Sequence, residues 1–453
     1  MPEMFANKAT DKRQEAARIV LQLRSAGFEA YFVGGCVRDF VMGVVPADYD
    51  IVTSALPDQV IALFNRTVAI GAKFGVVAVI VEGHSFEVAT FRSDDVYIDG
   101  RRPSNVHFTC AKEDVFRRDF TVNGLLMDPV TGEITDYVDG LADIQKKIIR
   151  TIGDPDKRFQ EDHLRMLRAI RFTANLNFKL DSSTQESIAK NVVQIKTISA
   201  ERIQDELNKL LTRGGARRGL ELMAQTEMLR EILPELDAMQ GVEQPPRFHP
   251  EGDVWQHTLM MMEILSEEKE AALNPVLAWG TLLHDVGKPL SRTEDESGVH
   301  FYGHVQHGGK IAEEIMQRLK FSRAQREAVL DLVLQHMNFM NVQKMRPARL
   351  KRFLRMPDFD LHLELHRLDC LASHGMLDNY EFCRNQLENL TMEELHPPRL
   401  LTGDDLIALG FTPGKIIGEI LRTLEDEQME GRITSQDEAK IFVEKNCKIL
   451  IKD

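Results

Sequence analysis

The sequence predicts an α+β protein, with a small sheet near its N-terminus followed by helical domains. One observation is the helical spacing of apolar residues over 12–27, which ends at Gly27. A second is the loss of strand signals after about Pro155. The third is a set of short β-type runs separated by polar turns, at Ala30–Val33, Tyr49–Thr53, Val76–Val81 and Phe86–Phe91.

The rest of the chain is predicted to be helical. Long 3.6-residue patterns occupy Glu161–Ala174, Ala200–Leu211 and Arg217–Met228. A chain of 453 residues exceeds one ordinary core, so several domains are expected. A proline-rich break at 240–250 is a predicted boundary, because proline cannot continue a helix. We predict four domains: 1–150 with the sheet, and the helical regions 151–240, 250–375 and 376–453.

Composition indicates a soluble globular protein, with 43% hydrophobic and 28% charged residues. No apolar run approaches the roughly 18 residues that a membrane span needs, so no membrane partner is expected. The five cysteines contain no C-x-x-C pair, which suits a reducing, cytoplasmic location. The net charge of −14 neither favours nor excludes a nucleic-acid partner, because local arginine clusters can still follow a phosphate backbone.

Two carboxylates, Asp48 and Asp50, follow a glycine turn, Gly34-Gly35-Cys36-Val37-Arg38-Asp39. On a strand, side chains at i and i+2 leave the same face, so both carboxylates can bind one pair of Mg²⁺ ions. The two glycines let backbone N–H groups approach a triphosphate closely. An isolated Asp-x-Asp is usually a turn or surface pair, but with this turn attached it predicts nucleotidyl transfer.

A third carboxylate is expected on a neighbouring strand. Glu87 lies between Phe86 and Val88, so its side chain should point opposite to theirs. We favour metal coordination or activation of the attacking hydroxyl for Glu87. The alternative is an edge-strand acid that faces water.

Nucleotide contacts are predicted in Arg117-Arg118-Asp119-Phe120-Thr121-Val122-Asn123. Adjacent arginines can bind phosphate oxygens, while Asp119 and Asn123 can hydrogen-bond ribose hydroxyls. Without other motifs, a dibasic pair usually marks a solvated surface. The polar segment 91–103 between the two motifs suits a mobile loop, with a passive connector as the alternative.

Asp162 and Arg165 are candidates for reading the incoming base. On one helix, their i,i+3 spacing would place both on the same face, where a simple ion pair is the alternative. An acceptor beside a donor matches an amino group beside a ring nitrogen, which cytosine and adenine both present. Uracil and guanine present the inverse pattern and would leave buried polar groups unpaired. The protein itself would then act as the template.

Taken together, these motifs resemble the bacterial (class II) branch of the tRNA nucleotidyltransferase and poly(A) polymerase family. The resemblance also rests on Asp139-Gly140-Leu141-Ala142-Asp143-Ile144 and Ser199-Ala200-Glu201-Arg202-Ile203, and it covers about residues 25–235. It implies a polymerase-β-like nucleotidyltransferase head followed by an all-α neck, body and tail. It also implies two Mg²⁺ ions at Asp48 and Asp50. The implied nucleotide-binding residues are Gly34, Gly35, Arg38, Arg117, Arg118, Asp119, Asn123, Asp162, Arg165 and Arg168.

Within that family, we favour template-independent addition of CCA to the tRNA 3′ end from CTP and ATP. Segment 94–108 appears full length, which disfavours addition of CC alone. Residues 71–76 lack the basic stretch of poly(A)-adding members. Asn123-Gly124, where many members have Asn-Ala, weakens the subclass assignment. Addition of A alone is the next alternative, and poly(A) addition is a further one.

A second metal site is predicted further along the chain, from the ordered set His257, His284-Asp285 and Asp369. Neutral imidazoles and carboxylates together bind divalent transition metals well. Residues 250–375 resemble the HD phosphohydrolase superfamily, which implies hydrolysis of phosphate esters. We prefer 2′,3′-cyclic phosphates at RNA ends as the substrate. Three flanking histidines, His304, His307 and His336, allow either one ion or two.

A reading from a different functional class makes the HD phosphohydrolase the main activity and the head an RNA- or nucleotide-binding module. For the oligomeric state we expect a monomer or a weak dimer.

Overall fold

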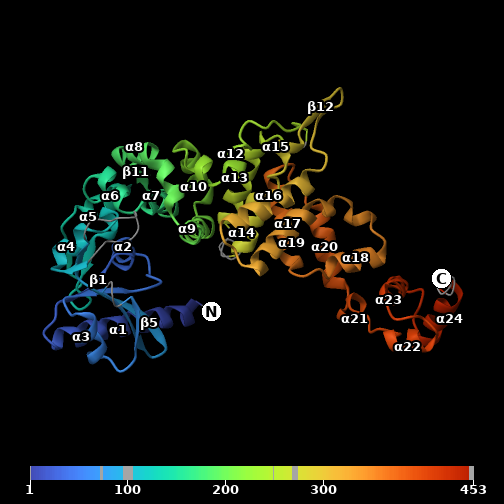
Figure 1. Ribbon diagram of the computed structural model, residues 1–453, viewed down its shortest axis with the longest axis horizontal. Coiled ribbons are helices and arrows are strands. Elements are labelled where there is room, and N and C mark those ends of the chain that lie inside the picture. The colour runs from blue at the N-terminus through green and yellow to red at the C-terminus, as the bar shows by residue number, and fades with distance from the viewer. Residues whose placement is uncertain (1, 72–74, 95–105, 248, 268–273, 448–453) are drawn as a thin grey trace. The chain divides into compact units, whose positions relative to one another are not determined.

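The computed structural model describes residues 2–71, 75–94, 106–247, 249–267 and 274–447 (Figure 1). The chain divides into two compact units, one formed by 1–237 with 318–321 and the other by 238–317 with 322–453. The predicted α+β class is confirmed, because the sheet lies in the first unit and the second is almost entirely helical. The four narrower domain limits stay predictions. Among the described residues, no helix combines the length and apolar character needed to cross a membrane.

A seven-stranded sheet forms the head, in the order β3-β4-β5-β2-β1-β8-β9 among the described residues. Its strands are β1 (Ala30–Val33), β2 (Asp50–Thr53), β3 (Thr67–Gly71), β4 (Val76–Val81), β5 (His84–Thr90), β8 (Leu125–Met127) and β9 (Ile134–Asp136). β3, β8 and β9 were not predicted. β8 is three residues long and buried throughout, so it has no polar alternation to reveal it.

Strand pairing around β2 determines which side chains meet at the head site. β1 and β2 are antiparallel, with Val33 opposite Asp50. β2 and β5 are parallel, with Ile51 opposite Val88. Continuing this register by one residue places Asp50 beside Glu87. Parallel neighbours run in the same direction, so both carboxylates lie toward the same end of the sheet.

Helices α1 (Pro2–Ser25) and α2 (Gly35–Val41) precede and follow β1. The predicted helix over 12–27 therefore begins earlier, at Pro2, and ends two residues before Gly27, which has a φ of 89°. The described ends of the loop between the two nucleotide motifs, β6 (Arg92–Asp94) and β7 (Val106–Phe108), pair as an antiparallel ribbon. Residues 95–105 of that loop and 72–74 of the subclass motif lie outside the described residues.

The helical part of the first unit differs from the predicted pattern in two places. A single helix over Glu161–Ala174 was wrong, because α6 (Pro155–Glu161) ends before Asp162 and α7 (Leu164–Asn175) begins after His163. The backbone N–H of Leu164 donates to Asp162 Oδ1 instead, at 3.1 Å. The predicted helix Arg217–Met228 was also wrong, because α10 (Ala216–Gln225) and α11 (Met228–Ile232) are separated by Glu227 with a φ of 59°. Helix α9 (Ala200–Thr212) agrees within one residue and packs against α7.

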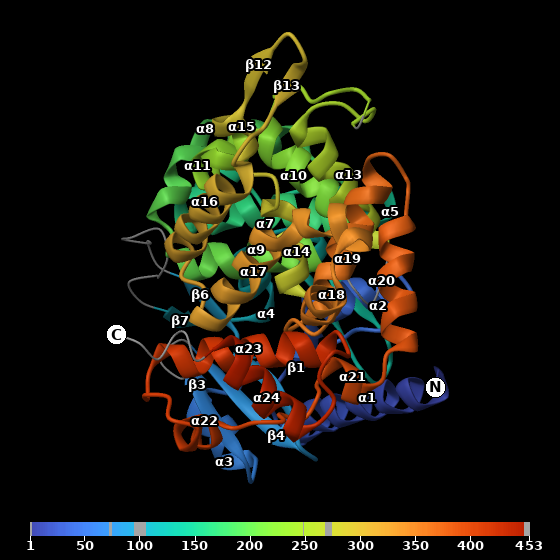
Figure 2. The ribbon, with the colours of Figure 1, turned by 90° about the vertical axis from the view of Figure 1, so that its right-hand side faces the viewer.

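In the second unit, the predicted ligands His257, His304 and Asp369 lie on helices. His284 and His336 are the first residues after two further helices, and Asp285 follows His284. The helices are α13 (Val254–Glu267), α14 (Pro275–Leu283), α16 (His304–Arg318), α17 (Arg323–Gln335) and α19 (Phe359–Ala372). α14 packs against α17, and α13 packs against α19. The region after Pro155 was predicted to lack strands, but its described residues contain three short ones. β11 (Lys179–Leu180) pairs with β10 (Ile148–Ile149), and β12 (Thr293–Asp295) pairs with β13 (Gly298–His300). The β12–β13 hairpin extends from the helices around it (Figure 2).

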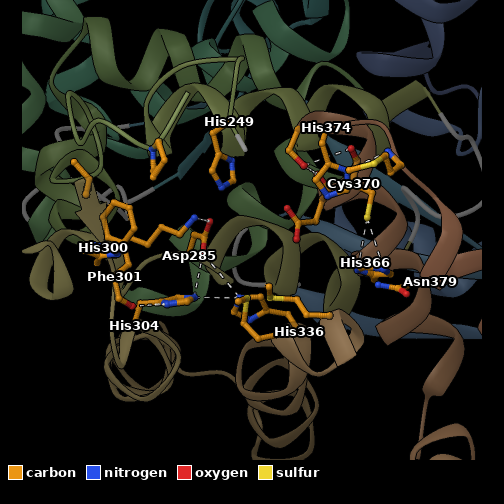
Figure 3. Close-up of a pocket in the computed structure, with 18 of the residues that line it drawn as sticks. His249, Asp285, His300, Phe301, His304, His336, His366, Cys370, His374 and Asn379 are labelled. Atoms are coloured by element: carbon orange, nitrogen blue, oxygen red, sulfur yellow. Dashed lines mark hydrogen bonds and ion pairs between the residues drawn. The ribbon is translucent and has the colours of Figure 1, made fainter. Parts of the chain in front are cut away.

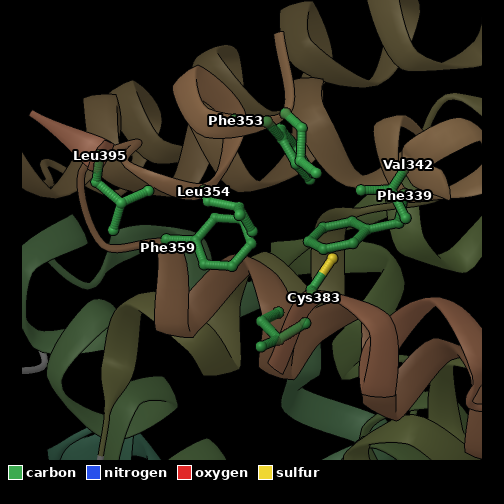
Figure 4. Packing of buried hydrophobic residues seen from close by; sticks show 9 residues of the cluster. Phe339, Val342, Phe353, Leu354, Phe359, Cys383 and Leu395 are labelled. Atoms are coloured by element: carbon green, nitrogen blue, oxygen red, sulfur yellow. The ribbon is translucent and has the colours of Figure 1, made fainter. Parts of the chain in front are cut away.

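Two separate apolar clusters support the C-terminal helices. One is built around Phe339, Phe353 and Phe359, whose rings make edge-on contacts beside the buried Cys383 (Figure 4). The other gathers Leu406, Phe411, Ile420, Leu424 and Val443 from α22 (Gly403–Ala408), α23 (Lys415–Met429) and α24 (Gln436–Asn446). Each cluster buries its own aromatic or aliphatic side chains, which is the main source of stability for such small helical layers.

Candidate active sites

The acidic cluster of the head lies at the beginning of β2. Asp50 is the first residue of that strand, and Asp48 lies two residues before it, outside the strand. Tyr49 between them is 5% exposed and packs on Phe32, so the expected alternation holds although Asp48 is not in the strand. Lys12 Nζ lies 2.7 Å from Asp48 Oδ1, so the lysine would have to move away for a metal ion to bind Asp48.

Glu87 completes this cluster. Phe86 and Val88 are each 1% exposed, whereas Glu87 is exposed on the other face of β5. Loss of water around the carboxylate, with the nearby charge of Glu87, raises the pKa of Asp50 to about 6. Arg118 opposes that rise, and Asp48 adds to it. Crowded carboxylates of this kind favour a divalent cation, which removes their mutual repulsion.

Gly34 brings the backbone against this cluster. Its φ of 75° lies in the left-handed region. A Cβ atom there would stand 3.9 Å from Asp50 Oδ2 and 3.6 Å from Arg118 Nη1. Gly34 and Gly35 therefore leave open backbone between an acidic group and a guanidinium, where a triphosphate with bound metal would fit.

The two arginines of the second motif are held by a residue that the sequence analysis missed. Asp114 has a fully buried side chain and accepts from Arg117 Nε and Nη2 at 2.9 and 2.6 Å. Its other oxygen accepts from Arg118 Nη2 at 2.9 Å. These bonds hold the pKa of Asp114 below its usual range despite its burial. Asp114 precedes the arginines by three and four residues, the spacing of helix neighbours, so this signal was present in the sequence.

Asp119 and Asn123 lie in a connected buried network. Arg168 donates to Asp119 Oδ2 from Nε at 2.9 Å and from Nη2 at 2.6 Å. Although burial acts against it, Arg168 lowers the pKa of Asp119 to about 2. Asn123 Nδ2 donates to Asp119 Oδ1 at 3.2 Å, and its Oδ1 accepts from Arg38 Nη1 at 2.8 Å.

Arg38 and Arg168 therefore support the ribose-reading candidates. Arg38 is 8% exposed and also donates to Asp39 Oδ1 from Nε and Nη2. Both guanidinium groups lie over the ring of Phe172, at 5.4 and 5.3 Å from its centroid. Direct contact of either arginine with a nucleotide stays a prediction.

Asp162 and Arg165 do not form the simple ion pair that was the alternative to base reading. Arg202, on α9, donates to Asp162 Oδ1 and Oδ2 at 3.2 and 2.7 Å. Arg165 donates to Glu161 Oε2 at 2.5 Å and, from Nη2, to the carbonyl oxygen of Arg117 at 2.9 Å. Because α6 ends before Asp162, the predicted shared helix face does not exist.

The second unit brings together six of the side chains predicted for the second metal site. One group contains His257, His284 and Asp369, and another contains Asp285, His304 and His336; within each group the ligand atoms lie within 4.8 Å of one another. His304 and His336 point toward Asp285 at one end of a cavity (Figure 3). His307, in contrast, is exposed and belongs to neither group.

Hydrogen bonds fix the histidine rings for metal binding. Nδ1 of His284, His304 and His336 lies 2.9, 2.9 and 2.7 Å from the backbone carbonyls of Thr281, Phe301 and Val333. A carbonyl oxygen only accepts, so each Nδ1 carries a proton and each Nε2 of the neutral ring offers a lone pair. Burial lowers the pKa of His336 to about 4, which keeps its ring neutral.

His257 is oriented by Glu251, which the sequence analysis also missed. Its Nδ1 lies 2.6 Å from Glu251 Oε1, the carboxylate–histidine pairing common behind metal ligands. Its buried Nε2 makes no hydrogen bond, although it lies 3.2 Å from Asp369 Oδ1. Burial lowers the pKa of His257, but Asp369 and Glu251 outweigh that effect and raise it to about 9. A nitrogen and a carboxylate that face one another in this way fit a bound cation.

Comparison with known proteins agrees with this geometry. The family model for the poly(A) polymerase head domain matches residues 30–150. The model described as a probable RNA- and SrmB-binding site of polymerase A matches 177–240, and the HD domain model matches 254–368. The chain is 32% identical over 449 residues to the CCA-adding enzyme of Ligilactobacillus salivarius, covering 99% of both chains. It is 32% identical to that of Bacillus subtilis, covering 93% of this chain and 95% of the relative.

Solved structures show the same relationship. The Bacillus stearothermophilus CCA-adding enzyme in complex with CTP aligns with a TM-score of 0.73 and 27% identity, covering 96% of this chain and 98% of that one. The Thermotoga maritima CCA-adding enzyme complexed with tRNA shares the fold, with a TM-score of 0.58 and 18% identity. The head fold and its acidic cluster define a nucleotidyltransferase joined to an HD domain. The chain belongs to the family of CCA-adding enzymes.

Proposed function

We propose that this protein adds CCA to the 3′ end of tRNA, using CTP and ATP. The observation that carries the proposal is the meeting of Asp50 and Glu87 on parallel strands beside Gly34. The full-length similarity to CCA-adding enzymes supports this reaction over a purely regulatory role. We further propose a cytoplasmic enzyme that is a monomer or a weak dimer.

In this reaction the tRNA 3′-oxygen bonds to the α-phosphorus of the nucleotide, and the bond to the β-phosphate bridging oxygen breaks to release pyrophosphate. Two Mg²⁺ ions held by Asp48 and Asp50 would activate the hydroxyl and stabilise the developing charge. Glu87 would either help to hold these ions or receive the proton of the attacking hydroxyl. Arg117 and Arg118, fixed by Asp114, would bind the triphosphate oxygens.

Choice of nucleotide is assigned to three side chains of the first unit. Asp119 is proposed to hydrogen-bond the ribose. Asp162 and Arg165 are proposed to read the shared edge of cytosine and adenine. Glu161 would have to release part of the Arg165 guanidinium when a base binds, because the two are now bonded.

A primer assay tests this function. Transfer RNA ending at the discriminator base, at −C or at −CC is incubated with CTP or ATP, and the added length is read. With CTP alone, two residues should be added to the discriminator base and one to −C; with ATP alone, one residue should be added to −CC. No incorporation of CTP, with a single A added to −CC, would instead identify an A-adding enzyme, and a long ladder with ATP would identify poly(A) polymerase.

The catalytic cluster is tested with the double variant Asp48→Ala, Asp50→Ala. It should lose incorporation while keeping its thermal stability, because Asp48 is exposed, and burial and the charge of Glu87 disfavour the charged form of Asp50. Asp58→Ala, an exposed carboxylate at the beginning of α3 (Pro57–Leu63), is the matched control and should keep full activity. Normal incorporation by the double variant would remove these residues from the mechanism.

A second activity, phosphate-ester hydrolysis, is favoured by the metal-ligand groups of the second unit. Four of these residues, Asp285, His304, His336 and Asp369, line a cavity of about 880 Å³ together with Lys288, whose Nζ lies 2.7 Å from Asp285 Oδ2. We propose that His257, His284, Asp285 and Asp369 hold a divalent transition metal, and that His304 and His336 hold a second ion together with Asp285. Such metals supply a nucleophilic hydroxide and neutralise phosphate charge. RNA ends with 2′,3′-cyclic phosphates are the proposed substrate.

Measured separately, the two activities distinguish the two functional classes. His336→Ala should lower the bound metal content and abolish cyclic-phosphate hydrolysis while leaving CCA addition intact. Hydrolysis by the wild type without any nucleotide incorporation would favour an HD phosphohydrolase with an RNA-binding head. Unchanged metal content in His336→Ala would remove that histidine from the ligand set.

A further inference from the structure

Helix α9 carries two charged side chains that hold both nucleotide-reading carboxylates. Arg202 and Glu206 are four residues apart, so they project from the same face of α9, the helix that packs against α7. Arg202 reaches Asp162, the candidate reader of the base. Glu206 reaches Arg168, which in turn holds Asp119, the candidate reader of the ribose.

The bond between Arg202 and Asp162 compensates for a break in the backbone. Asp162 lies between two helices, with φ −147° and ψ 104°; its N–H makes the last hydrogen bond of α6, to the carbonyl oxygen of Arg158, and the helix ends there. The guanidinium of Arg202 donates to both carboxylate oxygens, at 3.2 and 2.7 Å, a two-point contact that fixes the plane of the group. Oδ1 also accepts from the backbone N–H of Leu164, but Oδ2 keeps a second lone pair, so Asp162 can still accept a hydrogen bond from a base amine.

Glu206 fixes the other carboxylate, Asp119, indirectly through Arg168. It is 2% exposed, and its oxygens lie 3.4 Å from Arg168 Nη1 and 2.5 Å from Arg171 Nε. Arg168 therefore lies between two carboxylates, Glu206 on one side and Asp119 on the other. Two hydrogen bonds from Arg168 end on Oδ2 of Asp119. A movement of Arg168 would therefore displace the Asp119 carboxylate.

We propose that Arg202 and Glu206 are positioning residues for substrate selection, with Arg202 setting base choice and Glu206 setting ribose choice. The inference rests on the proposed function, in which Asp162 and Asp119 contact the nucleotide. Selection by hydrogen bonding works because an incorrect nucleotide leaves buried polar groups unpaired. This requires an acceptor that is held in one orientation. A carboxylate that is free to rotate discriminates less between correct and incorrect nucleotides.

The test is a matrix of kcat/KM values for CTP, UTP and dCTP on tRNA that lacks CCA. Arg202→Ala should lower the CTP-to-UTP ratio by about tenfold, with little effect on the CTP-to-dCTP ratio. Glu206→Gln should have the opposite pattern. Arg202→Lys keeps a charge but loses the two-point contact, so partial recovery of base choice is expected. It also serves as the second variant if Arg202→Ala folds poorly.

Two exposed acids of the same helix serve as matched controls, Glu201→Gln and Asp205→Asn. Both should leave the two ratios unchanged. If Arg202→Ala and Glu206→Gln lower the rates for all three nucleotides by one common factor, the residues are merely structural and the inference is overturned. Failure of the wild type to incorporate CTP at all would instead overturn the proposed function.

Discussion

Asp114→Asn tests how the triphosphate-binding arginines are held. The Asp114 carboxylate is fully buried and accepts three side-chain hydrogen bonds from Arg117 and Arg118. Breaking a buried ion pair typically costs about 3–5 kcal/mol. The two arginines keep 20% and 19% of their side chains exposed, so water replaces part of what is lost. We therefore expect a loss of roughly 2–4 kcal/mol in unfolding free energy.

Activity should change in a specific way. Freed arginines bind the triphosphate less well before and during reaction, so KM for CTP should rise by about 10- to 100-fold, with a smaller change in kcat. Steady-state kinetics and chemical unfolding check the two effects. Glu113→Gln, an exposed neighbour on α4 (Ala111–Phe116), is the control. A variant with normal stability and normal KM would refute the reasoning.

The same variant has a pH signature with a definite sign. The pKa of Asp114 is lowered in the folded protein, so its contribution is present above the unfolded value of about 3.9 and is lost as the pH falls through the lowered value. The stability difference between wild type and variant should therefore shrink on acidification. A difference that stays constant down to low pH would contradict the assigned ion pairs.

Three further predictions concern other parts of the molecule. Asp119→Asn should lower stability by about 2 kcal/mol at neutral pH, and the loss should disappear as the pH falls from about 4 to 2, because the folded pKa of Asp119 is about 2; denaturant curves measured at several pH values check this. Gly287→Ala should strongly destabilise the second unit in thermal unfolding, since its Cβ would lie 2.1 Å from the carbonyl oxygen of His304, whereas Gly418→Ala, in open space, should be neutral or stabilising. Removal of metal by a chelator should lower the melting temperature of wild type but not of His336→Ala, and His307→Ala should behave as wild type; equal shifts in all three would argue against a site built on His336.

Sequence patterns predicted the residues of the head site better than their partners. Alternation along a strand is a local property, so the outward side chain of Glu87 followed from Phe86 and Val88 alone. The partner of Asp162 did not follow, because Arg202 is 40 residues away and only the packing of α9 on α7 brings the two together. The helix break at Asp162 was missed for a related reason, since the apolar pattern continues across it.

Histidine patterns show the same limit. The order of His257, His284, Asp285 and Asp369 predicted four ligands that the structure divides between two neighbouring groups, with Asp285 in the second. Sequence alone left open whether His304, His307 and His336 belonged to it, since all three are near in sequence to helical segments. The structure separates them by direction, because His304 and His336 turn Nε2 toward Asp285 while His307 is exposed to water.

The break between α6 and α7 has a consequence for how such an enzyme can diversify. The carboxylates proposed for chemistry belong to the sheet, whereas the side chains proposed for choosing the nucleotide belong to helices and the joint between them. Substitutions at that joint can change which nucleotide is added without altering the strands that carry the reaction. Evolution could therefore derive enzymes with a new terminal sequence from an unchanged catalytic core.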